Sequence, residues 1–591
     1  MFGGYFVSLE DLPSVAIIIE TYNIMEKIRI YCENTQTYTE IDFGTRLLDV
    51  AKYMMPKETE GTEDKQILAA LVDNSLKGLD FELCRPHTIK FIGYSDPNGI
   101  RTYVRSLSFV LQKAVRDVFP EKYLNIKYSL PSGLYCEIHN VPESDRYEVH
   151  VPTGDELRSL KSRMKEIIAQ DIPFCKEILT AEEAEKLFNA NGQPEKVELL
   201  KTVGRYTYSA YFLDGTADTF HGPMLPSTGY LKTFELRPFG KGMCLQYPGL
   251  GQKDRIMPMK KQSKLAAALD DHEKWSRVLG VSSVGSLNKA ILEGHAREVI
   301  NLAEARHERK YAAIADAIRE RHENVKIVFI AGPSSSGKTS SSLRLAQQCK
   351  IVGMNPKVIE LDNYFVDREH TPKDENGNYD FESLHAMDLD FLNAQLNDLL
   401  SGKEVEIPRF NFKTGARTFE GHRMKLEKDD ILIMEGIHAL NPEMVPGVDQ
   451  SRIFRVYASA LTSLSLDENN NISTTDNRLL RRMVRDNRVR GISPEETILR
   501  WPSVRRGENR NIFPFQENAD VMFNSALIFE LPMLKYYAEP LLRRISPTSP
   551  AYSEAVRLLK FLSYIVALSP EEIAMIPPTS IMREFIGGQT L

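Results

Sequence analysis

The sequence contains little cysteine, and what it has is scattered. Six cysteines stand among 591 residues, and none forms a C-x-x-C pair. This spacing speaks against a disulfide framework and against a cysteine zinc site, and it fits a reducing cytoplasm. Long apolar runs are missing too, since none reaches the ~18 residues of a membrane-spanning helix. The sequence does not open with a basic segment and an apolar core. We therefore expect a cytoplasmic protein that neither spans a membrane nor is exported.

A strong charge of one sign is also absent. The formal net charge is −7, and the pI is about 6.0. Such a chain is not built mainly to coat nucleic acid, although a local basic patch stays open. The hydrophobic content of 42% and charged content of 26% are ordinary for a globular protein. A chain of 591 residues is expected to form three or more domains.

The most informative segment is residues 332–340, which reads GPSSSGKTS. It has the G-x-x-x-x-G-K-[ST] pattern of a phosphate loop, and it lies between an apolar run, 325–331, and a helix-like stretch, 341–349. Its glycines let backbone N–H groups turn toward phosphates, and the helix N-terminus adds a positive dipole. The alternative is a Gly/Ser turn beside a surface lysine. The flanking pattern favours a nucleoside triphosphate site.

Each residue type in this loop has a predicted role. Lys338 is expected to reach the terminal phosphates as a catalytic cation, and the Thr339 hydroxyl is expected to ligate Mg²⁺. The residues predicted to bind the nucleotide are Gly332, Ser334, Ser335, Ser336, Gly337, Lys338, Thr339 and Ser340.

Residues 325–545 alternate short apolar runs with helical stretches. The strand candidates are 326–331, 357–361, 431–434, 453–457 and 521–523. This alternation predicts an α/β domain with a mostly parallel sheet and helices on both faces. Ligands of such sheets bind at the carboxyl ends of the strands. The phosphate loop, Asp362 and Glu435 all fall there.

The rest of the chain divides around this domain. Residues 1–93 and 94–261 read as two α+β domains, 262–324 as a charged helical connector and 546–591 as a helical tail. The segment 467–476, DENNNISTTD, is polar and is predicted to be a loop.

A kinase of small alcohols needs more than a phosphate loop. It needs a carboxylate that orients and deprotonates the acceptor hydroxyl, an acidic group near Mg²⁺, and cations around the transferring phosphoryl group. Asp362 follows one predicted strand, and Glu435 ends another. The alternatives are a turn residue for Asp362 and a solvated strand end for Glu435. An arginine-rich helix follows, and the i, i+3 and i+4 spacing of its arginines places them on one face, where they could serve as these cations. The alternative is an exposed basic helix or a surface salt-bridge face. The arginines are Arg478, Arg481, Arg482 and Arg485.

Taken in order, the motifs GPSSSGKTS, LDNYF, YDFESLHAMD, IPRFNF, MEGIHAL and RLLRRMVRD resemble the uridine kinase and phosphoribulokinase family of P-loop kinases. The resemblance covers residues 325 to about 530 and implies that ATP and Mg²⁺ are used. It also implies that Asp362 is the catalytic base and that Glu435 supports Mg²⁺. Arg481 and Arg485 would belong to a catalytic lid over the phosphates. The residues implied to contact the acceptor are Asp388, Phe410, Phe412, Arg417 and Arg478.

The acceptor region departs from the family pattern P-x-Y-x-F-x-x-H-x-R. Phe412 and Arg417 are retained, but Phe410 replaces the tyrosine and Gly415 replaces the histidine. The polar groups that would read a pyrimidine edge are therefore missing. A site without them should discriminate bases poorly or accept another molecule.

Residues of about 25–280 resemble the N-terminal half of threonyl-tRNA synthetase, a ubiquitin-like TGS domain followed by an editing domain. The stretches that carry this resemblance are DPNGIRTYVRSLSFVLQKAV, PSGLYCEI and TFHGPMLPSTGYLKTFEL. The editing domain's four zinc ligands fall on Arg105, Phe109, Phe220 and Met224. These side chains cannot complete a nitrogen/sulfur zinc site, so we expect no zinc.

What remains of this half is a fold that could bind RNA, bind a small effector or form a homo-oligomer. Arg101, Arg105 and Lys113 make only a weak basic face, which gives RNA binding little support. His221, beside a Gly-Pro turn, is more often structural than a ligand.

Two hypotheses follow. The first is an ATP-dependent kinase that phosphorylates a hydroxyl of a small nucleoside-like or sugar-like acceptor. The second is an RNA-linked regulator in which a synthetase-derived module is coupled to an NTPase switch.

Overall fold

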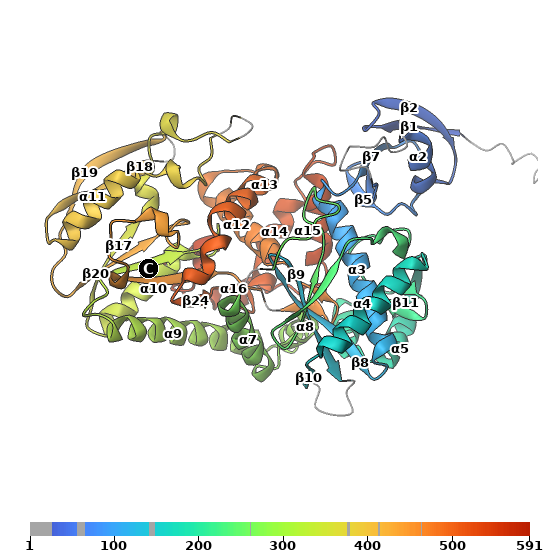
Figure 1. The fold of residues 1–591 in the computed structure, drawn as a ribbon, viewed down its shortest axis with the longest axis horizontal. Helices are drawn as coiled ribbons and strands as arrows, with labels where there is room; N and C mark the ends of the chain where they lie inside the picture. Colours follow the sequence, from blue (N-terminus) through green and yellow to red (C-terminus); the bar gives the residue numbers. More distant parts are fainter. Residues whose placement is uncertain are drawn as a thin grey trace, which may run out of the picture.

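The computed structural model describes residues 27–55, 66–140, 148–259, 262–374, 377, 379–411, 414–462 and 464–591. Figure 1 shows the small N-terminal sheet in blue at the upper right and the α/β sheet region at the left, with the C-terminal helices between them. The chain ends beside α10, on the far side from the N-terminal sheet (Figure 1).

The first domain is a five-stranded sheet with one helix. The sheet order is β2-β1-β7-β4-β5, and β1 and β7 are parallel. The alternating burial of β1 turns Ile28 and Ile30 toward Leu47 and Val50 of the helix α2, so one face of the sheet is covered. The elements are β1 (Lys27–Cys32), β2 (Thr37–Asp42), β3 (Thr45–Arg46), α2 (Leu47–Met54), β4 (Ala69–Val72), β5 (Ser75–Lys77), β6 (Glu82–Leu83) and β7 (Thr88–Ile92).

The second domain packs the long helix α3 (Pro97–Val118) against an antiparallel sheet. Asp96 caps this helix by accepting from the Asn98 N–H at 2.8 Å. The sheet contains β8 (Lys122–Leu130), β9 (Gly133–Asn140), β10 (Val149–His150), β14 (Glu235–Phe239) and β15 (Gly242–Gln246). The remaining elements are α4 (Gly154–Ala169), β11 (Cys175–Thr180), α5 (Ala181–Ala190), α6 (Pro194–Val203), β12 (Thr207–Leu213) and β13 (Thr216–Asp218).

The connector is helical, as its proline-free sequence predicts. It consists of α7 (Ser263–Val278), α8 (Val284–Leu292) and α9 (Ala296–Glu320). The long helix α9 packs along α10 (Lys338–Ile351) under the kinase-like sheet (Figure 1). Within the described ranges, no helix combines the length and the apolar character that crossing a bilayer requires.

The third sheet has the order β17-β20-β16-β21-β24, and all four pairings are parallel. The predicted strands are confirmed to within two residues at either end. The central strand is buried on both faces: Val328 and Ile330 pack against α9 and α10, while Ile327 and Phe329 face the side of α11 (Leu389–Leu400). The strands are β16 (Ile327–Ala331), β17 (Asn355–Glu360), β20 (Asp430–Glu435), β21 (Ile453–Ser459) and β24 (Val521–Asn524).

A hairpin and a helical bundle complete the molecule. The hairpin is formed by β18 (Val405–Asn411) and β19 (Ala416–Met424). The bundle contains α12 (Thr474–Arg490), α13 (Pro494–Asn511), α14 (Glu530–Leu542), α15 (Tyr552–Leu562), α16 (Pro570–Ala574) and α17 (Met582–Ile586). Its core also includes side chains from α8, so the tail and the connector are packed together.

The prediction of a loop over residues 467–476 is wrong. The segment contributes to the hairpin β22 (Ser465–Asp467) and β23 (Asn470–Asn471), which inserts between the two halves of the chain. The Glu468 carboxylate accepts hydrogen bonds from the N–H groups of Glu195 (2.8 Å) and Lys196 (3.2 Å). Polar side chains lie buried here because the other half supplies their partners, and no local pattern reveals that.

Candidate active site

The phosphate loop has the backbone that its glycines predict. β16 ends at Ala331, and α10 begins at Lys338. A Cβ at Gly332 would lie 1.9 Å from the carbonyl oxygen of Ala458, so only glycine fits. Gly337 has φ 82°, in the left-handed region. The buried hydroxyl groups of Ser335 and Ser336 have no hydrogen-bond partner among the described residues, which suits a loop that receives an anion.

An acidic edge faces this loop. Glu435 is the last residue of β20, and it lies in register with Glu360, the last residue of β17. Asp362 follows in the short 3₁₀ helix Leu361–Tyr364. The Thr339 hydroxyl donates to Oε1 of Glu435 at 2.6 Å. The two residues predicted to hold Mg²⁺ therefore touch, and their hard oxygen atoms fit that ion.

The charges of this edge influence one another. Burial raises the pKa of Glu435 to about 7, the positive charge of Lys338 opposes this shift, and Asp362 adds to it. Burial also raises the pKa of Asp362, with Lys338 again opposing. Lys338, Asp362 and Glu435 thus form one electrostatic unit at the carboxyl edge of the sheet. A carboxylate with a raised pKa is a better proton acceptor than an exposed one.

The arginine helix α12 lies against the loop, and its arginines divide into two pairs. Arg478 is 1% exposed, pairs with Glu508 and donates to the carbonyl of Ser334 at 3.1 Å. Arg481 is fully buried and pairs with Glu530. Both arginines are thus held in buried ion pairs and donate to carbonyl groups of the loop.

Arg482 contacts the loop, and Arg485 contacts a carboxylate that lies against the loop. Arg482 donates to the Ser334 hydroxyl at 2.8 Å. Arg485 lies 3.4 Å from Glu584, a residue of the C-terminal helix α17. Of the two arginines predicted to be catalytic, Arg485 has the more open position.

The predicted acceptor residues occupy different environments. Asp388 caps α11 by accepting from the Phe391 N–H at 3.1 Å, and it pairs with Arg417 at 2.9 Å. Phe410 is only 7% exposed and packs edge-on against Phe365 in the core. Phe412 lies outside the described residues. The structure brings Asp388 and Arg417 together and places Phe410 beneath the surface.

The sequence analysis did not identify two residues, Glu382 and Arg368, that lie near predicted site residues. Burial and the charge of Glu508 raise the pKa of Glu382 to about 7, while Arg482 opposes the shift. Its position inside the motif YDFESLHAMD was the available signal. A Cβ at Gly415 would lie 2.7 Å from Nε of Arg368, so an arginine covers the position where the family pattern has histidine.

The C-terminal helix α17 also reaches the phosphate loop, which no motif indicated. Oε2 of Glu584 accepts from the Ser340 hydroxyl at 2.7 Å and from its N–H at 3.4 Å. A Cβ at Gly337 would lie 2.3 Å from Cδ1 of Ile581. The guanidinium group of Arg481 lies 5.1 Å from the Phe585 ring. The carboxylate of Glu584 therefore already accepts the hydrogen bonds of Ser340, one of the residues predicted to bind phosphate.

The four residues that the second resemblance aligns with zinc ligands lie in one region of the front half. The rings of Phe109 and Phe220 are 5.1 Å apart, and Met224 is buried beside them. Arg105 donates to the carbonyl of Pro223 at 2.5 Å. Across the described ranges, no group of three or more His, Cys, Asp or Glu side chains could hold a metal ion.

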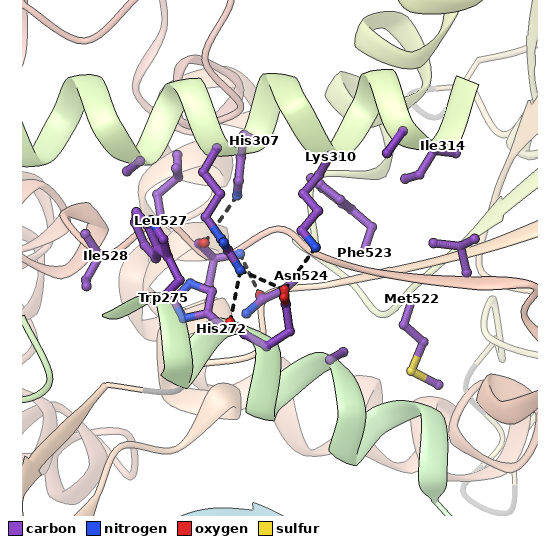
Figure 2. Close-up of a pocket in the computed structure, with 17 residues that line it drawn as sticks. His272, Trp275, His307, Lys310, Ile314, Met522, Phe523, Asn524, Leu527 and Ile528 are labelled. Atoms are coloured by element: carbon purple, nitrogen blue, oxygen red, sulfur yellow. Dashed lines mark hydrogen bonds and ion pairs between the residues drawn. The ribbon is translucent and has the colours of Figure 1, made fainter. Parts of the chain in front are cut away.

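A cavity of about 210 Å³ lies between α7, α9 and β24. Figure 2 shows His307 and Lys310 pointing down from α9 toward Asn524, with His272 and Trp275 on the facing helix. Arg306 and Lys310 both pair with Asp271, and the Asn524 side chain bonds the backbone of Leu461. Because most of its polar groups already have partners, we assign this cavity to packing of the connector.

Comparisons with known proteins find similar sequences for both halves of the chain. Residues 327–528 match the model of the Phosphoribulokinase / Uridine kinase family. A threonine–tRNA ligase of Francisella tularensis subsp. tularensis (strain SCHU S4 / Schu 4) is 26% identical over 200 residues, which cover 33% of this chain and 29% of the ligase. The ligase of Carboxydothermus hydrogenoformans is 28% identical over 190 residues, covering 32% and 28%. The chain spans less than a third of the length of these curated relatives.

Among solved structures, a possible uridine kinase from Bacillus stearothermophilus aligns at 18% identity with a TM-score of 0.23, covering 35% of this chain and 99% of that chain. The chain thus combines two similarities: its N-terminal region is similar to threonine–tRNA ligases, and residues 327–528 match the model of the Phosphoribulokinase / Uridine kinase family.

Proposed function

We propose that this protein is an ATP-dependent phosphotransferase that phosphorylates a hydroxyl group of a nucleoside-like acceptor. The observation that carries the proposal is the convergence of Lys338, Asp362 and Glu435 on one sheet edge, with Thr339 hydrogen-bonded to Glu435 at 2.6 Å. A pure binding module has no need of a buried carboxylate opposite a phosphate loop.

In the proposed reaction, the acceptor hydroxyl gives its proton to Asp362 as its oxygen attacks the γ-phosphorus of ATP. The new P–O bond forms while the bond between the γ-phosphorus and the bridging oxygen breaks, and ADP leaves with that electron pair. Lys338 and Arg485 offset the charge on the phosphates. Thr339 and Glu435 would hold Mg²⁺, which when bound offsets further phosphate charge.

The acceptor is proposed to lie beside Asp388 and Arg417, where a diol could bond the carboxylate. A non-nucleoside sugar is the second candidate. It is favoured by the absence of a side chain at Gly415, by the arginine over that glycine, and by the core position of Phe410. These features remove the tyrosine hydroxyl and the histidine ring that the family pattern places beside a pyrimidine base.

For the N-terminal half, we propose a TGS-like domain (1–93) and an editing-like domain (94–261) that binds no zinc. We propose that the whole protein acts in the cytoplasm. Metal analysis of the purified protein tests the zinc statement. About one zinc per chain, lost on mutating residues of the editing-like domain, would contradict it.

ADP release across a panel of nucleosides and sugars, with and without bulk tRNA, tests the function. We expect release that depends on one acceptor and is indifferent to tRNA. Triphosphate hydrolysis that needs tRNA and no small acceptor would instead support the RNA-linked regulator.

A further inference from the structure

A large cavity lies between the two halves of the molecule, and none of the described residues that line it belongs to the phosphate loop. Its volume is about 760 Å³, inside the range of about 300–1,000 Å³ typical of small-molecule sites. Its walls come from α3, from the β22–β23 hairpin, and from α13 and α15. Figure 1 shows α15 between α13 and α3 at the centre of the molecule.

The charges that line this cavity are unbalanced. Five arginines face three carboxylates. One part of the lining is internally paired: Arg101 bonds Glu554 at 2.8 Å, and Arg557 bonds Asp476 at 2.7 Å. Arg505 has only Glu508, which also pairs with Arg478. The surplus is therefore positive.

Two arginines carry most of this surplus. Within the described part of the chain, neither Arg105 nor Arg506 has an ion-pair partner. The guanidinium of Arg105 lies against the backbone at Gly222, where an added Cβ would come within 2.6 Å of it. The pKa of Arg105 is lowered to about 10, mainly by burial and in smaller part by the positive charges of Arg101 and Arg557. A half-buried guanidinium without a carboxylate is costly unless an anion is bound.

The surroundings show the same excess of positive charge. On α15, burial lowers the pKa of Lys560 to about 8, and the charges of Arg105, Lys176 and Arg205 contribute to this shift. The ring nitrogen atoms of His221, in the cavity wall, are buried without a hydrogen-bond partner among the described residues. The neutral ring can therefore still give and accept one hydrogen bond.

The remaining wall is apolar and aromatic. Phe220, Tyr247 and Trp501 face the cavity together with aliphatic side chains of the hairpin and α12. Such a wall suits a flat or apolar body attached to the anionic group.

We propose that this cavity binds a phosphorylated small molecule of about mononucleotide size, whose phosphate meets Arg105 and Arg506 and whose body packs on Phe220 and Trp501. Charge-assisted bonds from guanidinium to phosphate supply the recognition. The described lining of this cavity contains no residue of the phosphate loop, so the proposal does not depend on the kinase function.

Calorimetric titration of the full-length Lys338→Ala protein with uridine 5′-monophosphate and with inorganic pyrophosphate tests this site. The Lys338→Ala change weakens phosphate binding at the loop, and the part of the remaining binding that depends on Arg105 and Arg506 reports the cavity, because neither arginine lies at the loop or beside Asp388 and Arg417. We expect one site per chain, and an affinity at least about tenfold weaker in both Arg105→Met and Arg506→Met. Arg500→Met removes an exposed arginine of α13 outside the cavity and should change the affinity less than about twofold.

Arg506 is exposed, so its replacement leaves the core intact and remains informative if Arg105→Met does not fold. No binding of either probe, or binding that both arginine variants leave unchanged, would overturn the proposal. Arginine-dependent binding of bulk tRNA without binding of the small probes would also overturn it, in favour of an RNA surface.

Discussion

At the scale of single residues, the candidate chemistry depends on three side chains at one sheet edge. Burial raises the pKa values of Asp362 and Glu435, and the positive charge of Lys338 stabilises the ionised forms of both. The charge of Lys338 therefore acts on two groups: the phosphates that it is predicted to bind and the carboxylates of the acidic edge.

Replacement of Lys338 by alanine should abolish phosphoryl transfer, because the point charge on the phosphates is lost. Acceptor-dependent ADP release measures this. Lys350→Ala, an exposed lysine at the end of the same helix, is the matched control and should keep full activity. Near wild-type turnover of Lys338→Ala would show that the phosphate loop is not the nucleotide site.

The Asp362→Asn variant should keep nucleotide binding and lose kcat by about 10²-fold or more, the usual scale for removing a general base. Titration with a non-hydrolysable ATP analogue and steady-state kinetics separate the two effects. Asp390→Asn, an exposed aspartate of α11, serves as the control. A normal kcat for Asp362→Asn would reduce Asp362 to a turn residue.

At the scale of elements, the short helix α17 places a carboxylate against the phosphate loop. Met582 and Phe585 are fully buried in the bundle core, and this packing fixes the helix beside the loop. Glu584 holds the hydroxyl and N–H of Ser340, which are predicted to bind phosphate. A carboxylate at that place repels a phosphate of like charge.

We expect Glu584→Gln to tighten nucleotide binding by roughly tenfold, equivalent to about 1.4 kcal/mol, because the amide keeps the shape and loses the charge. Displacement of a fluorescent ATP analogue measures the affinity. Glu571→Gln, in the exposed first turn of α16, is the control. Weaker binding in Glu584→Gln would mean that the carboxylate instead assists the nucleotide.

At the scale of the whole molecule, the two halves are joined by buried polar groups. Lys196 of α6, Asp218 and Asp467 are all fully buried, and the lysine pairs with Asp218 and lies 3.6 Å from Asp467. The hairpin that carries Asp467 belongs to the kinase half, so this cluster links the halves. Removal of one partner from such a buried network lowers the stability strongly, because the remaining charges are left unpaired.

Lys196→Met should therefore destabilise the interface by about 3–5 kcal/mol, the usual cost of stranding a buried charge. Denaturant-induced unfolding of the full chain measures the free energy of the first transition. Lys201→Met removes an exposed lysine of the same helix that pairs with Glu185 and should cost less than about 1 kcal/mol. Equal effects of the two variants would show that the cluster contributes nothing special.

The sequence by itself determined the phosphate loop, the five parallel strands and the placement of Asp362 and Glu435 at their ends. These features follow from local rules: the left-handed glycine, the all-apolar strand and the alternation of strand with helix. The meeting of Thr339 with Glu435 also follows, because parallel strands end at a common edge.

Only the tertiary structure decided which arginines are buried, where the tail goes and what becomes of the polar segment 467–476. Arg478 and Arg481 share a helix face with Arg482 and Arg485, yet the first two are buried in ion pairs with Glu508 and Glu530. Glu584 lies 244 residues from Ser340, and Glu468 lies 273 residues from Glu195. Contacts between such distant residues depend on how whole domains pack, and no local periodicity encodes them.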